Sequence, residues 1–264
     1  MQIGSKKWKN LIDNGAKKLD VKIDQVKKDQ FVIHALELIK WNQKINLTAI
    51  TDPFEIAVKH FLDSIAPAPV IPPDASLLDI GSGGGFPGIP LKVLMPSLSV
   101  TLIDSSRKKV SFLKHVIRTL KLENIEALYV RAEDLAKDRT FANNYDVIIS
   151  RALSSMDTFV QMALPLLAKE GIIIVMKGKT SKEEIESEYS LIKKMSGISE
   201  GNENNITMNL KKYTLPYLQS ERSILILKLP AARLRRDPRP ELGSKAQSSR
   251  CRECSAFRQC FARL

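Results

Sequence analysis

The sequence predicts an α/β fold, in which a helical N-terminal lobe precedes a Rossmann-like, mostly parallel sheet of seven strands. Three observations support this prediction. After about residue 75, short apolar runs alternate with amphipathic stretches of helix length, which is typical of βαβ units. One apolar run leads directly into a glycine-rich loop at residues 81–88. The last two runs stand too close together for a crossover helix, which predicts an antiparallel hairpin at one end of the sheet.

The helical lobe is expected over residues 1–66. Residues 6–44 have helical spacing, and Asp24 is placed to cap the second helix of this stretch. A shorter helix should run from about Pro53, a proline in a tolerated first-turn position, to Ile65. Prolines at 67, 69, 72 and 73 then form a stiff connector that marks the end of the lobe. One face of the second helix is expected to carry Phe31, His34, Ala35, Leu38, Ile39 and Asn42.

The sheet domain is expected over residues 67–229. Pro216 lies in the sixth run and suggests an edge position or a break. The candidate strands are Ser76–Ile80, Ser99–Ile103, Ile125–Val130, Asp146–Ser150, Ile172–Met176, Lys211–Leu218 and Ser223–Leu229.

Composition and charge restrict the class of protein. The chain has 264 residues, of which 44% are hydrophobic and 27% charged, as in ordinary globular proteins. A formal net charge of +12 favours polyanionic partners such as nucleic acid. Residues 1–20 do not form a signal peptide, and no stretch approaches a transmembrane helix, so we expect a cytoplasmic protein without a membrane partner. No heptad pattern suggests a coiled coil, and a monomer is expected.

Residues 230–264 differ in character from the rest of the chain. Residues 231–264 contain eight Arg and one Lys with three acidic residues, and all three cysteines lie here. Cys251, Cys254 and Cys260 would suit a zinc site, but the tail lacks histidine and a fourth ligand, so no metal is expected. We hypothesise that this tail is disordered or is translated from a shifted frame or foreign sequence, which sequencing of the source gene would settle.

The glycine loop is the first candidate ligand site. An apolar strand, residues 77–80, precedes Gly81 to Gly88, and a helix follows from Ile89. Glycines permit positive φ and close backbone approach, so a ligand can lie against the loop near the positive end of the helix. The loop alone is weakly specific, because residues 83–88 also fit the dinucleotide pattern G-x-G-x-x-G. There is no P-loop pattern.

Acidic residues follow the next two strands. Asp104 lies twenty-three residues after Gly81, where a carboxylate can accept hydrogen bonds from both ribose hydroxyls. The alternative is a cap for a helix that starts at Ser105 or Ser106. Residues 131–134, Arg-Ala-Glu-Asp, are placed where an adenine edge would lie, although they also suit a simple helix N-terminus.

Several segments resemble the RsmG family, also called GidB or glucose-inhibited division protein B, the guanine-N7 methyltransferases of small-subunit ribosomal RNA. They are residues 41–50, 60–64, 79–90, 104–109, 150–152 and 177–178, within a resemblance over roughly residues 30–229. The run Gly-Phe-Pro-Gly-Ile-Pro is especially specific. The resemblance implies a class I methyltransferase fold, S-adenosylmethionine as cofactor, and 16S ribosomal RNA or the small ribosomal subunit as partner.

The resemblance also implies residue roles. Cofactor contacts are implied at Gly81, Phe86, Ala132, Glu133 and Arg151, to which the glycine-loop and ribose arguments add Gly83 and Asp104. For Arg151 the alternative is a surface cation or the partner of a carboxylate. Guanine N7 carries an in-plane lone pair and no proton, so no catalytic acid or base is nominated. His60 and His115 are alternatives, but a lone histidine is more typical of packing.

The RNA site and the overall function keep open alternatives. Candidate phosphate contacts are Lys59, Arg107, Lys108, Lys177 and Lys179, each with an alternative as an ordinary solvated side chain. A nicotinamide-dependent oxidoreductase is a competing function, although the terminal hairpin and Asp79 suit a methyltransferase better. A third is a noncatalytic RNA-binding or division-linked module, because the family is expected to end on a basic Tyr-Pro-Arg and Gly-Thr-Pro type segment that this tail lacks. Naked RNA and an assembled subunit both remain candidate substrates.

Overall fold

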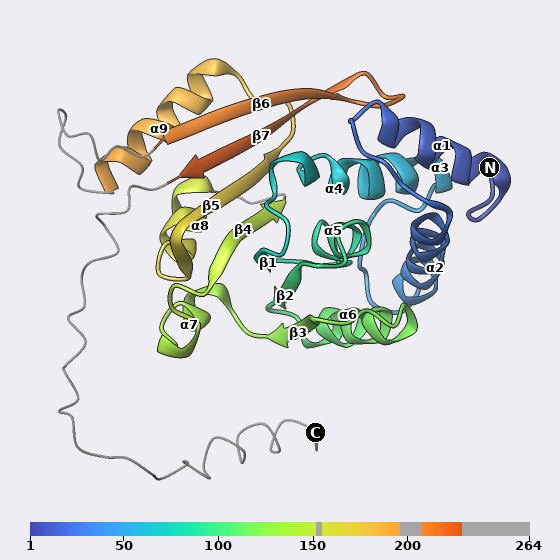
Figure 1. Ribbon diagram of the computed structural model, residues 1–264, viewed down its shortest axis with the longest axis horizontal. Coiled ribbons are helices and arrows are strands. Elements are labelled where there is room, and N and C mark those ends of the chain that lie inside the picture. Colours follow the sequence, from blue (N-terminus) through green and yellow to red (C-terminus); the bar gives the residue numbers. More distant parts are fainter. Residues whose placement is uncertain (152–154, 196–206, 229–264) are drawn as a thin grey trace, which may run out of the picture. The chain divides into compact units, whose positions relative to one another are not determined.

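The computed structural model describes residues 1–151, 155–195 and 207–228. Its seven strands form one sheet in the order β3-β2-β1-β4-β5-β7-β6. The strands are β1 (Ser76–Ile80), β2 (Ser99–Asp104), β3 (Ile125–Tyr129), β4 (Tyr145–Arg151), β5 (Leu167–Lys177), β6 (Thr207–Leu215) and β7 (Ser220–Lys228). Strands β1 to β5 are parallel, and β7 lies antiparallel between β5 and β6 (Figure 1). The predicted fold class and terminal hairpin are confirmed.

Both faces of the sheet are covered, because neighbouring strand residues point to opposite sides. In β4, Val147 and Ile149 join one buried cluster, while Ile148 between them joins the other. The first cluster lies under α5 (Gly88–Leu94) and α6 (Arg107–Thr119), and the second under α7 (Ala132–Leu135), α8 (Met156–Ala163) and α9 (Lys182–Met195), as Figure 1 shows. This double cover explains why the central strands are continuously apolar.

The N-terminal helices pack on the first of these clusters. Helices α1 (Lys6–Lys17) and α2 (Gln25–Asn42) both contribute to it, and the Asp24 side chain caps α2 by accepting from the Lys27 amide. Phe31, His34, Ala35 and Leu38 are buried, as the spacing predicted. The core of the helical segment is therefore continuous with the core of the sheet, and the described residues of both belong to one compact unit.

The helix predicted from Pro53 to Ile65 has a different internal geometry from the one expected. It begins as α3 (Pro53–Glu55), continues as a π-helix, η1 (Ile56–Leu62), and ends as α4 (Asp63–Ile65). The apolar residues of the π-helical part, including Phe61 and Leu62, are fully buried. The wider turn of a π-helix changes which side chains share a face, and such segments occur often at functional sites. This helix carries His60 and Asp63.

Short 3-10 turns, η2 (Ala68–Val70) and η3 (Arg139–Phe141), lie in the proline connector and before β4. Strand β6 ends at Leu215, so Pro216 follows an edge strand. Within the described residues, none of the helices combines the length and the apolar character that membrane crossing needs. The predicted features of residues 230–264, including the cysteines, lie outside the described residues.

Candidate active site

The glycine loop is fixed against the neighbouring strand by backbone hydrogen bonds. The amides of Gly81 and Ser82 donate to the Ile103 carbonyl at 2.9 and 3.0 Å, and the Gly83 amide donates to Asp104 Oδ2 at 3.0 Å. Gly81 and Gly83 have φ values of +76° and +55°, in the region that favours glycine. A Cβ added to Gly81 would meet no atom within 4 Å, so its backbone faces open space.

Asp79 fixes the far end of the loop. Its buried Oδ2 accepts the Gly88 amide at 2.9 Å, and a Cβ on Gly88 would lie 2.3 Å from Leu102 Cδ2. Burial raises the pKa of Asp79 to about 7, against the lowering effect of the Gly88 hydrogen bond. Asp79 and Gly88 therefore set the shape of the loop from beneath.

A cavity of about 270 Å³ opens beside the loop, at the carboxyl ends of β1, β2 and β3. Four of the predicted cofactor residues line it: Gly81, Asp104, Ala132 and Glu133. The other lining residues are Ile80, Ile103, Ser105, Val130, Arg131 and Met162. Met162 comes from α8, and no sequence signal had singled it out. In parallel α/β sheets, ligands bind at this edge.

Asp104 is not the cap of α6. Ser106 takes that role, and its Oγ accepts from the Lys109 amide. The Asp104 carboxylate instead accepts from two backbone amides, those of Gly83 at 3.0 Å and Ser106 at 2.8 Å. These bonds hold the carboxylate at the cavity wall. Residues 131–134 do begin a helix, α7, as the alternative proposed, and the first three of them line the cavity as well.

The other three predicted cofactor residues, Gly83, Phe86 and Arg151, do not line this cavity in the described structure. The Phe86 ring is buried between two histidine rings, with centroids 4.8 Å from His34 and 4.6 Å from His60 and interplanar angles of 13° and 12°. The Arg151 guanidinium carbon lies 5.4 Å from the centroid of the Phe86 ring. The cofactor contacts at all seven residues remain predictions.

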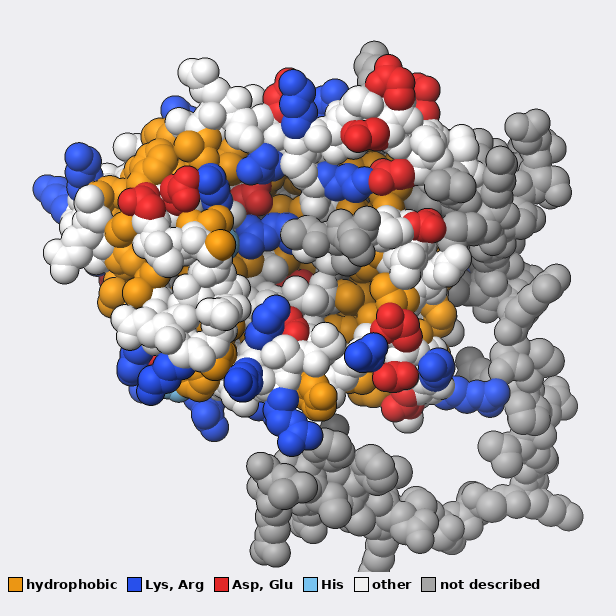
Figure 2. Space-filling view, turned by 180° about the vertical axis from the view of Figure 1, so that it is seen from behind, with side chains coloured by type: hydrophobic (Ala, Val, Ile, Leu, Met, Phe, Trp, Pro, Cys, Tyr) orange, Lys and Arg blue, Asp and Glu red, His pale blue; other side chains and the backbone are white. Residues whose placement is uncertain are grey.

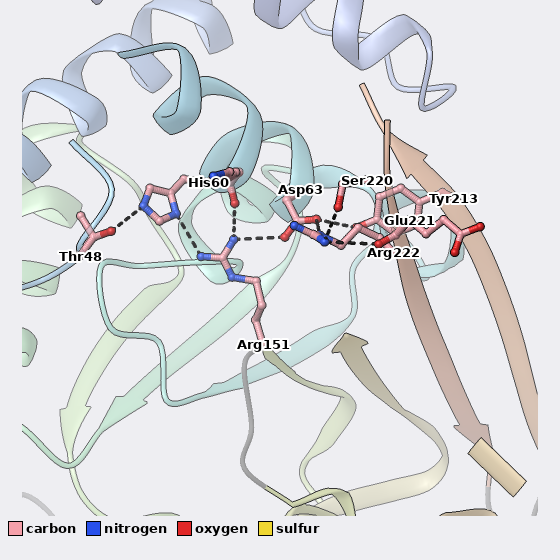
Figure 3. Close-up of polar contacts among 9 residues, drawn as sticks. Thr48, His60, Asp63, Arg151, Tyr213, Ser220, Glu221 and Arg222 are labelled. Carbon is pink, nitrogen blue, oxygen red and sulfur yellow. Dashed lines mark hydrogen bonds and ion pairs between the residues drawn. The ribbon is translucent and has the colours of Figure 1, made fainter. Parts of the chain in front are cut away.

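Arg151 leaves the end of β4 and reaches the π-helix (Figure 3). Its Nη1 donates to the Lys59 carbonyl at 2.8 Å and to Asp63 Oδ2 at 3.4 Å, and its Nη2 donates to His60 Nδ1 at 3.2 Å. A guanidinium can only donate, so His60 Nδ1 is an acceptor and its proton lies on Nε2, which faces Thr48 Oγ1 at 2.9 Å. Burial, and then the Arg151 charge, lower the pKa of His60 to about 3. His60 is thus neutral and a structural partner of Arg151.

The other histidines are also engaged in packing or pairing. His34 Nε2 donates to the Gly84 carbonyl at 2.8 Å, and burial lowers the pKa of His34 to about 4. His115 lies 2.7 Å from a Glu37 carboxylate oxygen, on the surface between α2 and α6. Neither His60 nor His115 lines the cavity. Neither is therefore placed to act there as the acid or base that the sequence left as an alternative.

Asp63 joins Arg151 to the terminal hairpin. The Tyr213 hydroxyl donates to Asp63 Oδ1 at 2.7 Å, and Arg222 Nε lies 3.5 Å from the same oxygen (Figure 3). Tyr213 and Arg222 face each other across β6 and β7. Sequence reasoning missed all three residues. Two signals were available for Asp63: it lies in residues 60–64, which resemble the family, and it is the acidic residue of a mostly apolar run at residues 56–65.

A larger cleft, of about 860 Å³, lies beside this network. Three of the predicted RNA contacts line it, namely Lys59, Lys177 and Lys179, together with Arg151 and Arg222. Acidic residues of α9 line it too, and Lys177 pairs with Glu188. The rear face of the molecule likewise mixes Lys and Arg with Asp and Glu and has no broad patch of a single sign (Figure 2). Specific cations, rather than a uniform basic surface, are therefore available to an anionic ligand.

Arg107 and Lys108, the other two predicted contacts, do not line this cleft. They lie in the first turn of α6, and the Arg107 guanidinium carbon is 5.2 Å from the centroid of the Tyr129 ring.

The cavity and the cleft occupy neighbouring strand ends. Ser150 Oγ donates to the Ile80 carbonyl at 2.7 Å, so the residue before Arg151 is tied to the residue before Gly81.

Comparison with known families decides the relationship. Residues 27–210 match the family described as GidB, rRNA small subunit methyltransferase G. The chain belongs to this family. Three GidB-family relatives carry the name ribosomal RNA small subunit methyltransferase G. The Oceanobacillus iheyensis protein is 38% identical over 80% of this chain and 86% of its own length. The corresponding values are 41%, 83% and 96% for Geobacter sp. strain M21, and 47%, 68% and 81% for Geotalea uraniireducens.

Solved structures support the fold of this GidB-family chain. A SAM-dependent methyltransferase from Aquifex aeolicus has a TM-score of 0.51 at 17% identity, covering 69% of this chain and 96% of that one. P. horikoshii TYW2, solved in complex with MeSAdo, has a TM-score of 0.50 at 18% identity, covering 64% and 62%. The class I methyltransferase fold implied by the resemblance is confirmed. Membership of the GidB family removes the alternative of a nicotinamide-dependent oxidoreductase.

The segments that carried the family resemblance meet in space. Residues 79–90 and 104–109 contribute Gly81 and Asp104 to the cavity. Residues 60–64, 150–152 and 177–178 contribute side chains to the cleft. In this GidB-family chain, the segments that resemble the family therefore line two adjoining sites at one edge of the sheet.

Proposed function

We propose that this chain transfers the methyl group of S-adenosylmethionine to N7 of a guanine in 16S ribosomal RNA. The observation that carries the proposal is the position of the family's segments in a GidB-family chain, which form one nucleoside-sized cavity and one adjoining cleft lined by cations. The cavity is proposed to take the cofactor, and the cleft to take the target nucleotide.

The residues of the cavity suit an adenosyl group. The Gly81 backbone faces open space that a Cβ would enter, so a ligand can lie directly against it. Asp104 supplies a fixed carboxylate for ribose hydroxyls, and its oxygens retain lone pairs beyond the two amides they accept. Ile103, Val130 and Met162 supply apolar wall for a base. Ala132 and Glu133 then present backbone and carboxylate groups to the base edge.

The reaction needs little proton chemistry from the protein. When bound, S-adenosylmethionine supplies an electrophilic methyl group on a sulfonium centre. Guanine N7 attacks with a lone pair that carries no proton, so the protein's task is to hold the base in line with the methyl group. Arg151 is held by Lys59, His60 and Asp63, and we propose that it lies where the cofactor and the target base meet. No described residue is assigned as a general base.

RNA is the proposed occupant of the cleft. Lys59, Lys179 and Arg222 can contact phosphates, and such binding weakens steeply as salt is raised. A splayed, single-stranded base is the form in which a protein can reach guanine N7 most readily in RNA. As part of the proposal, the protein acts as a monomer in the cytoplasm, where ribosomal subunits are assembled.

The test is transfer of labelled methyl from S-adenosylmethionine to unmodified small ribosomal subunits, with their extracted RNA as a parallel substrate. Label in the RNA that is lost in Gly81→Ala and Arg151→Gln variants supports the proposal. Cofactor binding without transfer to either substrate would instead favour a noncatalytic RNA-binding module. Absence of cofactor binding would reject the assignment of the cavity.

A further inference from the structure

The cleft contains a carboxylate between two guanidinium groups. Asp63 is 7% exposed, and its two oxygens face different partners. Oδ2 accepts from Arg151 Nη1 at 3.4 Å, while Oδ1 lies 3.5 Å from Arg222 Nε and accepts the Tyr213 hydroxyl at 2.7 Å. The carboxylate thereby links the start of α4, the end of β4 and the terminal hairpin (Figure 3). Charge-assisted hydrogen bonds of this kind fix geometry as well as contributing energy.

The two arginines depend on Asp63 to different extents. Arg151 also donates to the Lys59 carbonyl at 2.8 Å and to His60 Nδ1 at 3.2 Å, so two groups on the π-helix hold it in addition to Asp63. Arg222 bonds otherwise to Ser220 Oγ at 2.8 Å and to the Glu221 carbonyl at 3.3 Å, both on its own strand. Among the contacts of the described residues, Asp63 is thus the group outside β7 that holds Arg222 in the cleft.

Resting on the proposed function, we infer that Asp63 is a positioning residue for RNA: it holds Arg222 in the cleft as a contact for a phosphate of the substrate. Tyr213 fixes the Asp63 carboxylate in this role through its hydroxyl. Nε of Arg222 faces Asp63 and Nη1 donates to Ser220 and Glu221, so Nη2 is the nitrogen that none of these contacts uses and that can donate to a phosphate oxygen. Arg151, with its own anchors, stays in place when Asp63 is neutralised.

The direction of the change in the KM for RNA distinguishes a positioning role of Asp63 from a simple effect of its negative charge. Replacing an acidic residue near an RNA site ordinarily strengthens RNA binding, because one repulsive charge is removed. The inference predicts the opposite for Asp63→Asn: a KM for RNA about tenfold higher, with a Kd for S-adenosylmethionine within about threefold of the wild-type value. The matched control is Glu170→Gln, which changes net charge equally at an exposed pair with Lys228, at the other end of β5. This control should leave the KM for RNA unchanged or slightly lower.

A double-mutant cycle tests whether Asp63 acts through Arg222. Arg222→Gln alone should raise the KM for RNA about tenfold and lower the salt dependence of RNA binding by about one phosphate contact. Adding Asp63→Asn to this variant should then cause no further rise. If instead the two effects multiply, or if Asp63→Asn leaves RNA binding unchanged or tightens it, the inference is wrong.

A second variant guards against a failure of Asp63→Asn to fold. Tyr213→Phe keeps every charge and removes only the hydroxyl, and it should raise the KM for RNA in the same direction by about threefold. Unchanged RNA kinetics in Tyr213→Phe would contradict the role given to the hydroxyl and the carboxylate. A wild-type protein without any transfer would overturn the proposed function itself, whereas active wild-type protein with unaffected variants would overturn only this inference.

Discussion

Substitution of Gly81 by alanine tests the cofactor cavity most sharply. Gly81 has φ +76°, where a side chain strains the backbone by about 1–2 kcal/mol. For a chain of this size, that strain should lower Tm by about 2–8 °C. No protein atom lies within 4 Å of the added Cβ, so no steric clash within the protein adds to this loss. The methyl group would instead enter space assigned to the cofactor.

We therefore expect Gly81→Ala to weaken S-adenosylmethionine binding tenfold or more, equivalent to at least ~1.4 kcal/mol. Titration calorimetry measures the Kd, and thermal unfolding without ligand measures the strain. Gly4→Ala is the matched control, because Gly4 has φ +84° and lies outside both the cavity and the cleft. Its Cβ would also lie 3.0 Å from Val32 Cγ1, so this variant should lose at least as much Tm as Gly81→Ala, with unchanged affinity. Wild-type affinity in Gly81→Ala would refute the placement of the cofactor against this loop.

Two further predictions concern the base of the loop. Gly88→Ala should lower the free energy of unfolding by about 1–3 kcal/mol in chemical denaturation, because its Cβ would lie 2.3 Å from Leu102 Cδ2 and 2.8 Å from Asp79 Oδ2; wild-type stability would contradict this packing. For Asp79, a folded pKa of about 7 against an ordinary value of 3.8 means that folding favours the protonated acid, so the wild type loses stability as pH rises from about 4 to about 7. Stability curves of Asp79→Asn and wild type should diverge over that range in favour of the variant, and parallel curves would argue against the raised pKa.

Local pattern was sufficient to predict the strands and the glycine loop. Buried parallel strands are apolar on both faces, and runs such as residues 77–80 and 147–149 carry that signal directly. The hairpin was predicted from the short spacing between the last two apolar runs, which leaves no room for a crossover helix. The exact position of the hairpin strands could not be predicted, and β6 occupies residues 207–215 rather than 211–218. Tyr217 and Gln219 adopt positive φ in the turn between β6 and β7, where no glycine marks the turn in the sequence.

The cavity was more predictable than the cleft. Gly81 and Asp104 end adjacent parallel strands, so topology brings them together. Asp63 and Tyr213 are 150 residues apart, and their contact depends on the π-helical turn and on the hairpin register. Neither property leaves a local periodic signal. For the same reason, sequence could not separate Lys59, Lys177 and Lys179, which line the cleft, from Arg107 and Lys108, which do not.

The central claim is methyl transfer to guanine N7, and one measurement addresses it directly. Unmodified small-subunit RNA is incubated with the protein and S-adenosylmethionine that carries an isotopically labelled methyl group, and the digested nucleosides are analysed by mass spectrometry. The account predicts label in 7-methylguanosine, dependent on the intact cavity at Gly81. Label on a different base or ring position, or unlabelled RNA despite measured cofactor binding, would contradict it.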